Sequence, residues 1–216
     1  MPCFSQYEVI IFDCDGVILD SNNMKIIAMR AALKSSLFPL DLIDTAVTAF
    51  KNNFGKSRLY HCQYFVEQLL GMEGKKSSAL QALILEHYSQ AVEDEYLQVP
   101  MTPGSIDLLQ SLNTKQLYIA SGSEEEQLIR VFKQRKLEQY FRQILGSPET
   151  KTNNVKNIIA QHSDAKILFI GDAIADYQAA HDNHIDFIFY SPYSNVKEAM
   201  LEMSKKYSFP VLYSFL

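Results

Sequence analysis

Two carboxylates stand one residue apart in the stretch IIFDCDGVILDS, which occupies residues 10–21. The apolar run VIIF before them is short and rich in β-branched residues, so it predicts a strand buried on both faces. Asp13 and Asp15 would then lie at the carboxyl end of that strand, where Gly16 permits a sharp turn. Ligands bind outside the carboxyl ends of the strands in open α/β sheets. The stretch therefore indicates either an active-site edge or a strand that ends in a polar loop.

Chemically useful side chains also follow three later apolar runs. Ser121 and Gly122 follow LYIA, Lys151 follows QILGSPET, Asp172 follows KILFIG, and Asp176 lies four residues beyond Asp172. Because the carboxyl ends of parallel strands meet at one edge of a sheet, these groups are expected to converge with the carboxylates of the first strand. Four strand ends with this mixture argue for a site rather than an inert sheet.

Such a set of groups is suited to phosphoryl transfer. Mg²⁺ prefers oxygen ligands, and the carboxylates of Asp13 and Asp172 could hold it beside a phosphate. One carboxylate could attack phosphorus and form an aspartyl-phosphate. Repulsion among clustered acids would raise at least one carboxyl pKa, so a second acid could hold a proton for the leaving oxygen. Ser121 and Lys151 would bind the phosphoryl oxygens.

Short strands alternate with helical patterns over most of the chain. Strands are expected at 9–12, 117–121, 142–146, 166–172 and 186–190, with helices at 124–137, 155–162 and 176–183. This alternation predicts an α/β fold with a Rossmann-like, doubly wound and mostly parallel sheet. Residues 1–20 and 101–216 would form this catalytic core.

Residues 21–100 contain no convincing strand. Their apolar residues recur at spacings of three and four, which is typical of amphipathic helices. The prolines and glycine of VPMTPG, at 99–104, mark the end of this region. The simplest organisation is an all-helical cap domain inserted directly after the first strand, where it would hang over the two carboxylates.

With these motifs in place, the sequence resembles the haloacid dehalogenase superfamily, specifically its phosphatases with a helical C1 cap inserted after the first strand. The resemblance is carried by DCDGVILDS at 13–21, ASGS around Ser121, Lys151, and GDAIADYQAA at 171–180. It covers essentially the whole chain.

The resemblance implies a role for each matching residue. Asp13 would be the nucleophile and Asp15 the general acid/base. Mg²⁺ would bind to Asp13, to the backbone carbonyl of Asp15 and to Asp172. Asp176 would be a supporting acid near the metal or near Lys151.

Substrate contacts are expected from both parts of the chain. Ser121, Gly122 and Lys151 would bind the phosphoryl group. In relatives with this type of cap, the turn that reads NNFGKSR here faces the catalytic pocket, so Lys56 and Arg58 would contact an anionic or hydroxyl-rich leaving group. A basic surface turn is the alternative interpretation.

Several residues allow a second interpretation. Lys151 is followed by threonine rather than by the proline that is frequent in the family, so Lys156 is a second candidate for the phosphate-binding lysine. Ser121 could instead cap the helix that follows it, and Ser21 is expected to cap the first helix of the insertion. Asp15 argues for phosphoester chemistry, because the founding dehalogenases of the family lack this second acid.

Composition narrows the class of protein. The chain has 216 residues and is 47% hydrophobic. Its net charge of -5 argues against binding to nucleic acid or to an acidic membrane surface. No apolar run approaches the roughly 20 residues that span a bilayer, and MPCFSQYE lacks the pattern of a signal peptide. Cys3, Cys14 and Cys62 fit neither a zinc site nor a disulfide framework, which indicates a reducing cytosol. We expect a cytoplasmic monomer or weak dimer.

The sequence therefore predicts a Mg²⁺-dependent phosphatase that acts on a small phosphorylated metabolite, such as a sugar phosphate or a phosphoglycolate-like ester. A phosphomutase of the β-phosphoglucomutase type would use the same aspartyl-phosphate and is the second hypothesis. A receiver-like or catalytically inactive binding module is the non-enzymatic alternative, although receiver domains are shorter and lack both the cap and the second acid.

Overall fold

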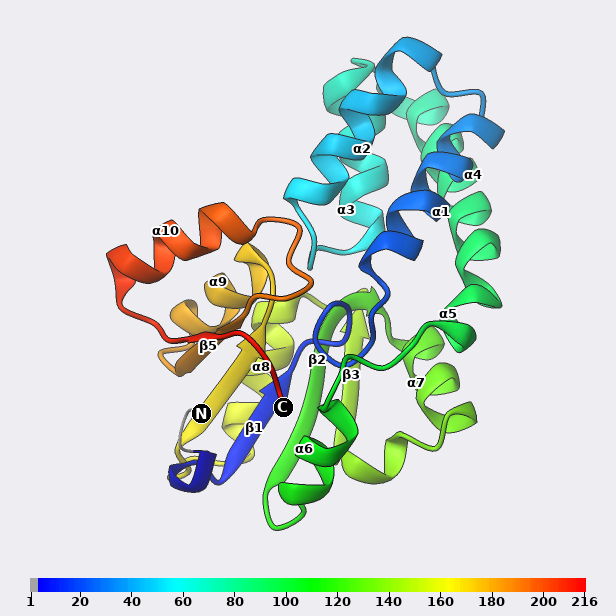
Figure 1. The fold of residues 1–216 in the computed structure, drawn as a ribbon. Helices are drawn as coiled ribbons and strands as arrows, with labels where there is room; N and C mark the ends of the chain where they lie inside the picture. Colours follow the sequence, from blue (N-terminus) through cyan, green and yellow to red (C-terminus); the bar gives the residue numbers. More distant parts are fainter. Residues whose placement is uncertain (1–3) are drawn as a thin grey trace.

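A parallel sheet with a block of helices above one end forms the structure, a computed structural model that describes residues 4–216 (Figure 1). Within these residues the sheet has six strands in the order β3-β2-β1-β4-β5-β6. Their bounds are β1 Val9–Phe12, β2 Gln116–Glu124, β3 Gln143–Ser147, β4 Ile167–Gly171, β5 Asp186–Tyr190 and β6 Val211–Leu212. Every pairing between these strands is parallel, so the predicted α/β fold is confirmed.

β1 lies in the middle of the sheet because its residues are apolar on both faces. All four are buried, and the strand pairs with β2 on one side and with β4 on the other. Side chains alternate along a strand, so Ile10 and Phe12 join one hydrophobic cluster while Val9 and Ile11 join another. Burial on both faces explains the unbroken apolar run.

Helices cover both faces of the sheet. They are α6 Ser105–Ser111, α7 Glu125–Gln134, α8 Lys151–Ala160, α9 Ile174–Asp182 and α10 Lys197–Tyr207, with short 3-10 helices at Phe4–Gln6 and Glu138–Tyr140. α6 and α7 pack on the face that carries Ile10 and Phe12, whereas α8, α9 and α10 pack on the other face.

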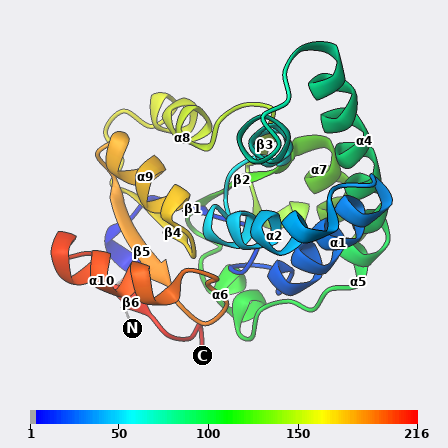
Figure 2. The same cartoon turned by 90° about the horizontal axis from the view of Figure 1, so that it is seen from above.

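The segment between β1 and β2 contains the predicted helical insertion. Its helices are α1 Asn22–Ser35, a 3-10 turn Leu40–Leu42, α2 Ile43–Asn52, α3 Arg58–Gln63, a π-helical segment Tyr64–Leu69, α4 Gly74–Glu93 and α5 Glu95–Gln98. They enclose a hydrophobic cluster of their own around Phe50, Phe65 and Tyr88. Figures 1 and 2 show this block, the cap, above the carboxyl ends of the central strands. Domain boundaries at residues 20 and 101 stay a prediction.

The two serines considered as helix caps have different outcomes. β2 continues to Glu124, so Ser121 lies inside the strand and Glu124 precedes α7. Ser21 holds the N-cap position of α1 as expected, and its carbonyl accepts the backbone N–H of Lys25 at 3.0 Å. Its hydroxyl, however, donates to Asp15 at 2.5 Å and makes no hydrogen bond to the helix backbone. In both places a tertiary arrangement overrides the local capping preference.

Other differences from the predicted elements are small. α8 begins at Lys151 rather than at residue 155, because the Thr150 hydroxyl caps it by accepting the Asn153 N–H at 3.2 Å. β6 has only two residues and no pattern of its own. Cys14 and Cys62 are buried free thiols, whereas Cys3 lies outside the described residues. Among residues 4–216, no helix combines the length and apolarity that a membrane span requires.

Candidate active site

Four buried charged side chains meet above the carboxyl end of the sheet. Asp13 directly follows β1, Asp172 directly follows β4, and Lys151 and Asp176 belong to the first turns of α8 and α9. Lys151 Nζ lies 3.1 Å from Asp13 Oδ1 and forms a second ion pair with Asp176. Lys156 lies on an exposed face of α8. The structure therefore brings Lys151, and not Lys156, to the carboxylates.

The three carboxylates of this cluster fit a cation. One oxygen from each of Asp13, Asp172 and Asp176 lies within 4.8 Å of the others. Oδ1 of Asp172 is buried and has no hydrogen-bond partner among the described residues, whereas Oδ2 accepts a 2.8 Å hydrogen bond from Asn22. A buried carboxylate oxygen is costly unless a proton or a cation satisfies it. Because the donors are all oxygens, Mg²⁺ fits them.

Asp176 holds its neighbours in place. Its Oδ2 accepts the backbone N–H groups of Asp172 at 3.0 Å and Ala173 at 2.9 Å, and its Oδ1 pairs with Lys151. The turn is so tight that a Cβ on Gly171 would lie 2.3 Å from the Cβ of Asp176. Asp176 thus shapes the turn after β4 and orients Lys151 as well as adding negative charge.

Crowded negative charge raises carboxyl pKa values in this cluster. Burial, followed by the charge of Asp176, raises the pKa of Asp13 to about 7, against the opposing effect of Lys151. Burial and the same neighbouring carboxylates raise the pKa of Asp172 well above its ordinary value. Burial alone would lower the pKa of Lys151, but its carboxylate partners raise it above the ordinary value. A bound cation would favour the ionised carboxylates.

Asp15 has a different environment, saturated with hydrogen-bond donors. Its Oδ1 accepts from Ser21 Oγ at 2.5 Å and from Tyr96 OH at 2.7 Å. Its Oδ2 accepts from Lys25 Nζ at 2.6 Å and from Ser123 Oγ at 2.8 Å. Burial alone would raise the pKa of Asp15, but the Lys25 ammonium and these hydrogen bonds outweigh it and lower the pKa below the ordinary value. The raised pKa expected among the clustered acids therefore belongs to the other carboxylates and not to Asp15.

Sequence reasoning missed the partners of these acids, namely Asn22, Lys25, Tyr96 and Ser123. One signal was available for Lys25. It stands three and four residues before Ala28 and Met29 in α1, on the face that the helix buries. A lysine at a buried position needs a carboxylate partner, so this placement could have pointed to an acid beneath the helix.

Ser121 and Gly122 lie at the end of the core part of β2. Ser121 is buried, and its hydroxyl accepts the backbone N–H of Ser123 at 3.2 Å. Gly122 touches the cap so closely that a Cβ there would lie 2.4 Å from the carbonyl oxygen of Gly55. Gly122 and Ser123 line a cavity over Asp13 and Asp15. Ser121 precedes them in β2 and is not among the residues that line this cavity.

The cap turn expected to read the substrate also reaches this cavity. Arg58 is 7% exposed, and its guanidinium donates to core residues Gln127 at 2.5 Å and Glu124 at 3.2 Å. Lys56 is exposed and lies 4.1 Å from the ring centroid of Tyr60. Both side chains line the cavity, but Arg58 is already engaged in holding the cap against α7.

The cavity over Asp13 and Asp15 is small, with a volume of about 30 Å³. Its walls carry Phe50, His61 and Tyr88 from the cap. A larger cavity of about 430 Å³ lies on the other side of Gly55, next to Lys151. The cap is therefore closed over the carboxylates, with little space above them and a larger cavity beside Lys151.

The fold and the site together define a hydrolase with a Rossmann-like parallel core, a helical cap and a buried acidic centre that fits a cation. A family model described as haloacid dehalogenase-like hydrolase matches residues 10–190, and the chain belongs to this family. Among curated proteins, none matches the chain.

Solved structures share the fold at low sequence identity. A haloacid dehalogenase-like hydrolase from Streptococcus pneumoniae is 18% identical with a TM-score of 0.73, covering 98% of this chain and 96% of its own. A magnesium-bound HAD-hydrolase from Bacillus subtilis is 20% identical with a TM-score of 0.63, and the match covers 87% of this chain and 90% of its own. A predicted phosphoglycolate phosphatase from Haemophilus somnus is 15% identical with a TM-score of 0.67, covering 86% of each chain.

Proposed function

We propose that this chain is a Mg²⁺-dependent phosphatase of small phosphorylated metabolites, acting in the cytoplasm as a monomer or weak dimer. The observation that carries the proposal is the buried meeting of Asp13, Lys151 and Asp172, with one Asp172 oxygen left for a cation. Mg²⁺ would be held by Asp13, Asp172 and the backbone carbonyl of Asp15, with Asp176 in support, and would neutralise charge on the phosphoryl group. The magnesium in the Bacillus subtilis structure supports this choice of metal.

Asp13 would act as the nucleophile. Its carboxylate would attack phosphorus, release the leaving alcohol and carry the phosphoryl group as an aspartyl-phosphate until water hydrolyses it. Lys151 would hold the phosphoryl oxygens together with Ser121 and the backbone of Gly122. The 3.1 Å ion pair between Lys151 and Asp13 supports this arrangement, because it puts the ammonium beside the attacking oxygen.

The Lys25 ammonium and three hydroxyl donors keep Asp15 ionised in the closed structure, so Asp15 would take up a proton from solvent while the cap is displaced. It would then pass this proton to the leaving oxygen and later take a proton from the attacking water. Its four hydrogen-bond donors leave no free position in the closed structure. Asp15 therefore has to exchange one donor for the leaving group. A neutral hydroxyl, such as that of Ser123, is easier to displace than the Lys25 ammonium.

The substrate is proposed to be a sugar phosphate or a phosphoglycolate-like ester, with Lys56 and Arg58 near its leaving group. The name of the Haemophilus somnus relative supports the second of these. A cavity of about 30 Å³ has room for a few atoms only, so the substrate would enter while the cap is displaced. Closure of the cap would then exclude water from the reacting group.

A phosphomutase is the second candidate, and the closed cap favours it. Asp13 is 2% exposed, so a phosphoryl group on this residue would be shielded from bulk water. A mutase needs such shielding because it returns the phosphoryl group to a sugar instead of losing it to water.

The test is an assay of phosphate release from a chromogenic phosphate ester with and without Mg²⁺, followed by a panel of sugar phosphates, phosphoglycolate and nucleotides. Release that depends on Mg²⁺ and disappears in Asp13→Asn is the expected result. Isomerisation of a sugar phosphate without phosphate release would select the mutase. No turnover of any ester would reject both enzymes and leave the inactive binding module.

A further inference from the structure

The first turn of α1 sends two side chains from the cap into the active site. Asn22 and Lys25 are three residues apart, so they share one face of the helix, and each is 4% exposed. Asn22 contacts Asp172 and Lys25 contacts Asp15. One turn of a cap helix therefore touches two functional carboxylates of the core.

Lys25 donates all three of its ammonium hydrogens to groups within the protein. Its Nζ lies 2.6 Å from Asp15 Oδ2, 2.5 Å from Ser123 Oγ and 3.2 Å from Tyr96 OH. An ammonium has three donors, so none remains for a substrate. A buried ammonium and a buried carboxylate each need the other, because either one alone would be an uncompensated charge. The position of α1 thus fixes the position of the Asp15 carboxylate.

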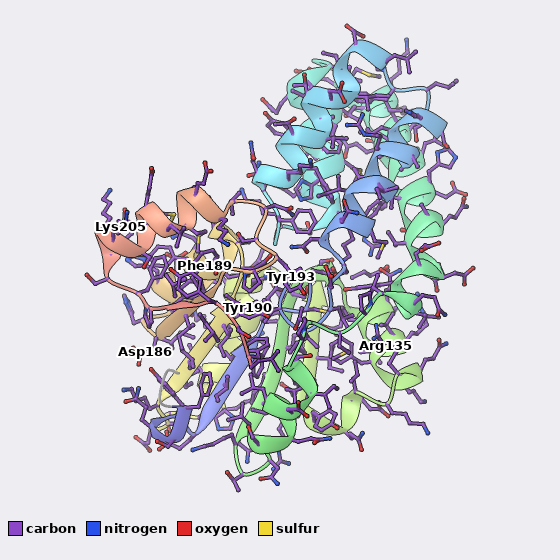
Figure 3. All side chains as sticks on the ribbon, in the orientation of Figure 1. Arg135, Asp186, Phe189, Tyr190, Tyr193 and Lys205 are labelled. Carbon is purple, nitrogen blue, oxygen red and sulfur yellow. The ribbon has the colours of Figure 1, made fainter. Side chains whose placement is uncertain are left out.

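Asn22 contacts Asp172, one of the three carboxylates that could bind a metal ion. Its Nδ2 donates to Asp172 Oδ2 at 2.8 Å and to the backbone carbonyl of Tyr193 at 3.0 Å. Figure 3 shows Tyr193 in the loop after β5, beside the base of the cap. Reversing the Asn22 amide would turn its oxygen against two acceptors, so the pattern defines its orientation.

The space around Asn22 leaves Asp172 little freedom. A Cβ on Gly16 would lie 2.3 Å from Asp172 Oδ2 and 2.4 Å from Asn22 Nδ2. With Oδ2 held in this way, Oδ1 is the oxygen of Asp172 that remains buried without a partner. Asn22 therefore determines which oxygen Asp172 offers to a cation.

We propose that Asn22 and Lys25 are positioning residues through which the cap orients two core carboxylates, Asn22 for metal binding at Asp172 and Lys25 for proton transfer at Asp15. The part that concerns Lys25 rests on the proposed phosphatase function, whereas the part that concerns Asn22 needs only metal binding. Because the two residues act on different carboxylates, their removal should change different measured quantities.

The experiment measures Mg²⁺ binding by calorimetry and steady-state kinetics for wild type, Asn22→Ala and Lys25→Met. Asn22→Ala should weaken Mg²⁺ binding about tenfold, within the range known for partners of metal ligands. Lys25→Met should keep the Mg²⁺ affinity and lower kcat about tenfold to a hundredfold with little change in KM. The KM stays because Lys25 has no donor left for the substrate.

Matched controls come from the same helix. Asn23→Ala and Lys34→Met remove exposed side chains of the same types and should change neither quantity. If Lys25→Met does not fold, because it strips Asp15 of its ammonium, Lys25→Gln retains a hydrogen-bond donor and is measured in its place.

Different failures have different meanings. Wild-type Mg²⁺ affinity in Asn22→Ala, or a raised KM with unchanged kcat in Lys25→Met, would overturn the proposal. Equal losses of metal affinity and of kcat in both variants would show a general loosening of the cap and would overturn it too. A wild-type protein that binds Mg²⁺ but turns over no ester would refute the phosphatase and the Lys25 part, while the Mg²⁺ titration of Asn22→Ala would still decide the metal part.

Discussion

Asp13 and Asp15 are two residues apart, yet they lie in opposite electrostatic surroundings. Burial and the nearby Asp176 carboxylate raise the pKa of Asp13 to about 7, against the Lys151 ammonium and the backbone N–H of Cys14. At Asp15, four donors led by the Lys25 ammonium outweigh burial and lower the pKa. Two identical side chains on one turn are thus set for different tasks by their neighbours.

The neighbours also come from different parts of the molecule. The charged partners of Asp13 stand at the carboxyl end of the core sheet, after β3 and β4. Lys25 and Tyr96, which hold Asp15, belong to cap helices α1 and α5. A movement of the cap would therefore change the surroundings of Asp15 far more than those of Asp13. We call these two environments the core side and the cap side of the site.

The largest expected effect removes the nucleophile of the core side. Asp13→Asn should lower turnover by more than about 10³-fold, because an amide is a poor nucleophile and a weak metal ligand. The measurement is phosphate release at saturating Mg²⁺, with the exposed Asp164→Asn as a control that should keep wild-type activity. Retention of a tenth of the wild-type rate would remove Asp13 from this role.

The second prediction concerns Arg58, which holds the cap, and with it the cap-side partners of Asp15, against the core. Arg58→Ala removes a charged hydrogen bond to the buried Gln127, worth about 1.5–3 kcal/mol, and a weaker one to the partly exposed Glu124. We therefore expect kcat/KM to fall tenfold to more than a hundredfold for small and large esters alike. Lys56→Ala should affect only a substrate large enough to reach this exposed side chain. Arg142→Ala, in an exposed part of the core, is the control. An effect of Arg58→Ala confined to the larger ester would mean that Arg58 contacts the leaving group rather than closing the cap.

Acid should weaken the cap through His61. Burial, followed by the charge of Lys56, lowers the pKa of His61 from 6.5 to about 3. Between these values the unfolded chain binds a proton that the folded protein does not, so this contribution is complete above pH 6.5 and is lost as pH falls. At pH 5 the loss is about 2 kcal/mol.

Urea unfolding at pH 7 and pH 5 measures this loss. The ring centroids of His61 and Phe50 lie 4.6 Å apart, and His61→Phe keeps an aromatic ring in this place. The variant should therefore lose the part of the pH dependence that His61 causes. The exposed His181→Phe should retain it. An unchanged difference between the two pH values in His61→Phe would show that another group is responsible.

A smaller effect concerns protons and metal on the core side. Because the pKa of Asp13 is about 7 without metal, Mg²⁺ has to displace a proton at lower pH. Mg²⁺ binding should be roughly tenfold weaker at pH 6 than at pH 8, with proton uptake by the buffer visible in calorimetry. Lys25→Met, a change on the cap side, should leave this pH dependence in place. A Mg²⁺ affinity that is constant from pH 6 to pH 8 would contradict the raised pKa.

Much of the core was predictable because its signals are local. β1 and β5 occupy the residues expected for them, since strands buried on both faces are continuous apolar runs. Parallel strands also present their carboxyl ends at one edge, so the placement of Asp13 and Asp172 followed from their positions after such runs. The start of α8 at Lys151 and the two-residue β6 were not predicted, because one depends on a cap hydrogen bond and the other on pairing with β5 alone.

The sequence by itself determined which side chains stand at the strand ends, because a short apolar run and the polar residue after it are neighbours in the chain. Only the tertiary structure decided which charges surround each acid. Tyr96 reaches Asp15 across 81 residues, and Asn22 reaches Asp172 across 150. Whether a helix rests its buried face on a carboxylate depends on how the whole cap packs against the core, and no local pattern records that packing. The two aspartates of DCD are alike in the sequence and become different only when the cap and the core meet.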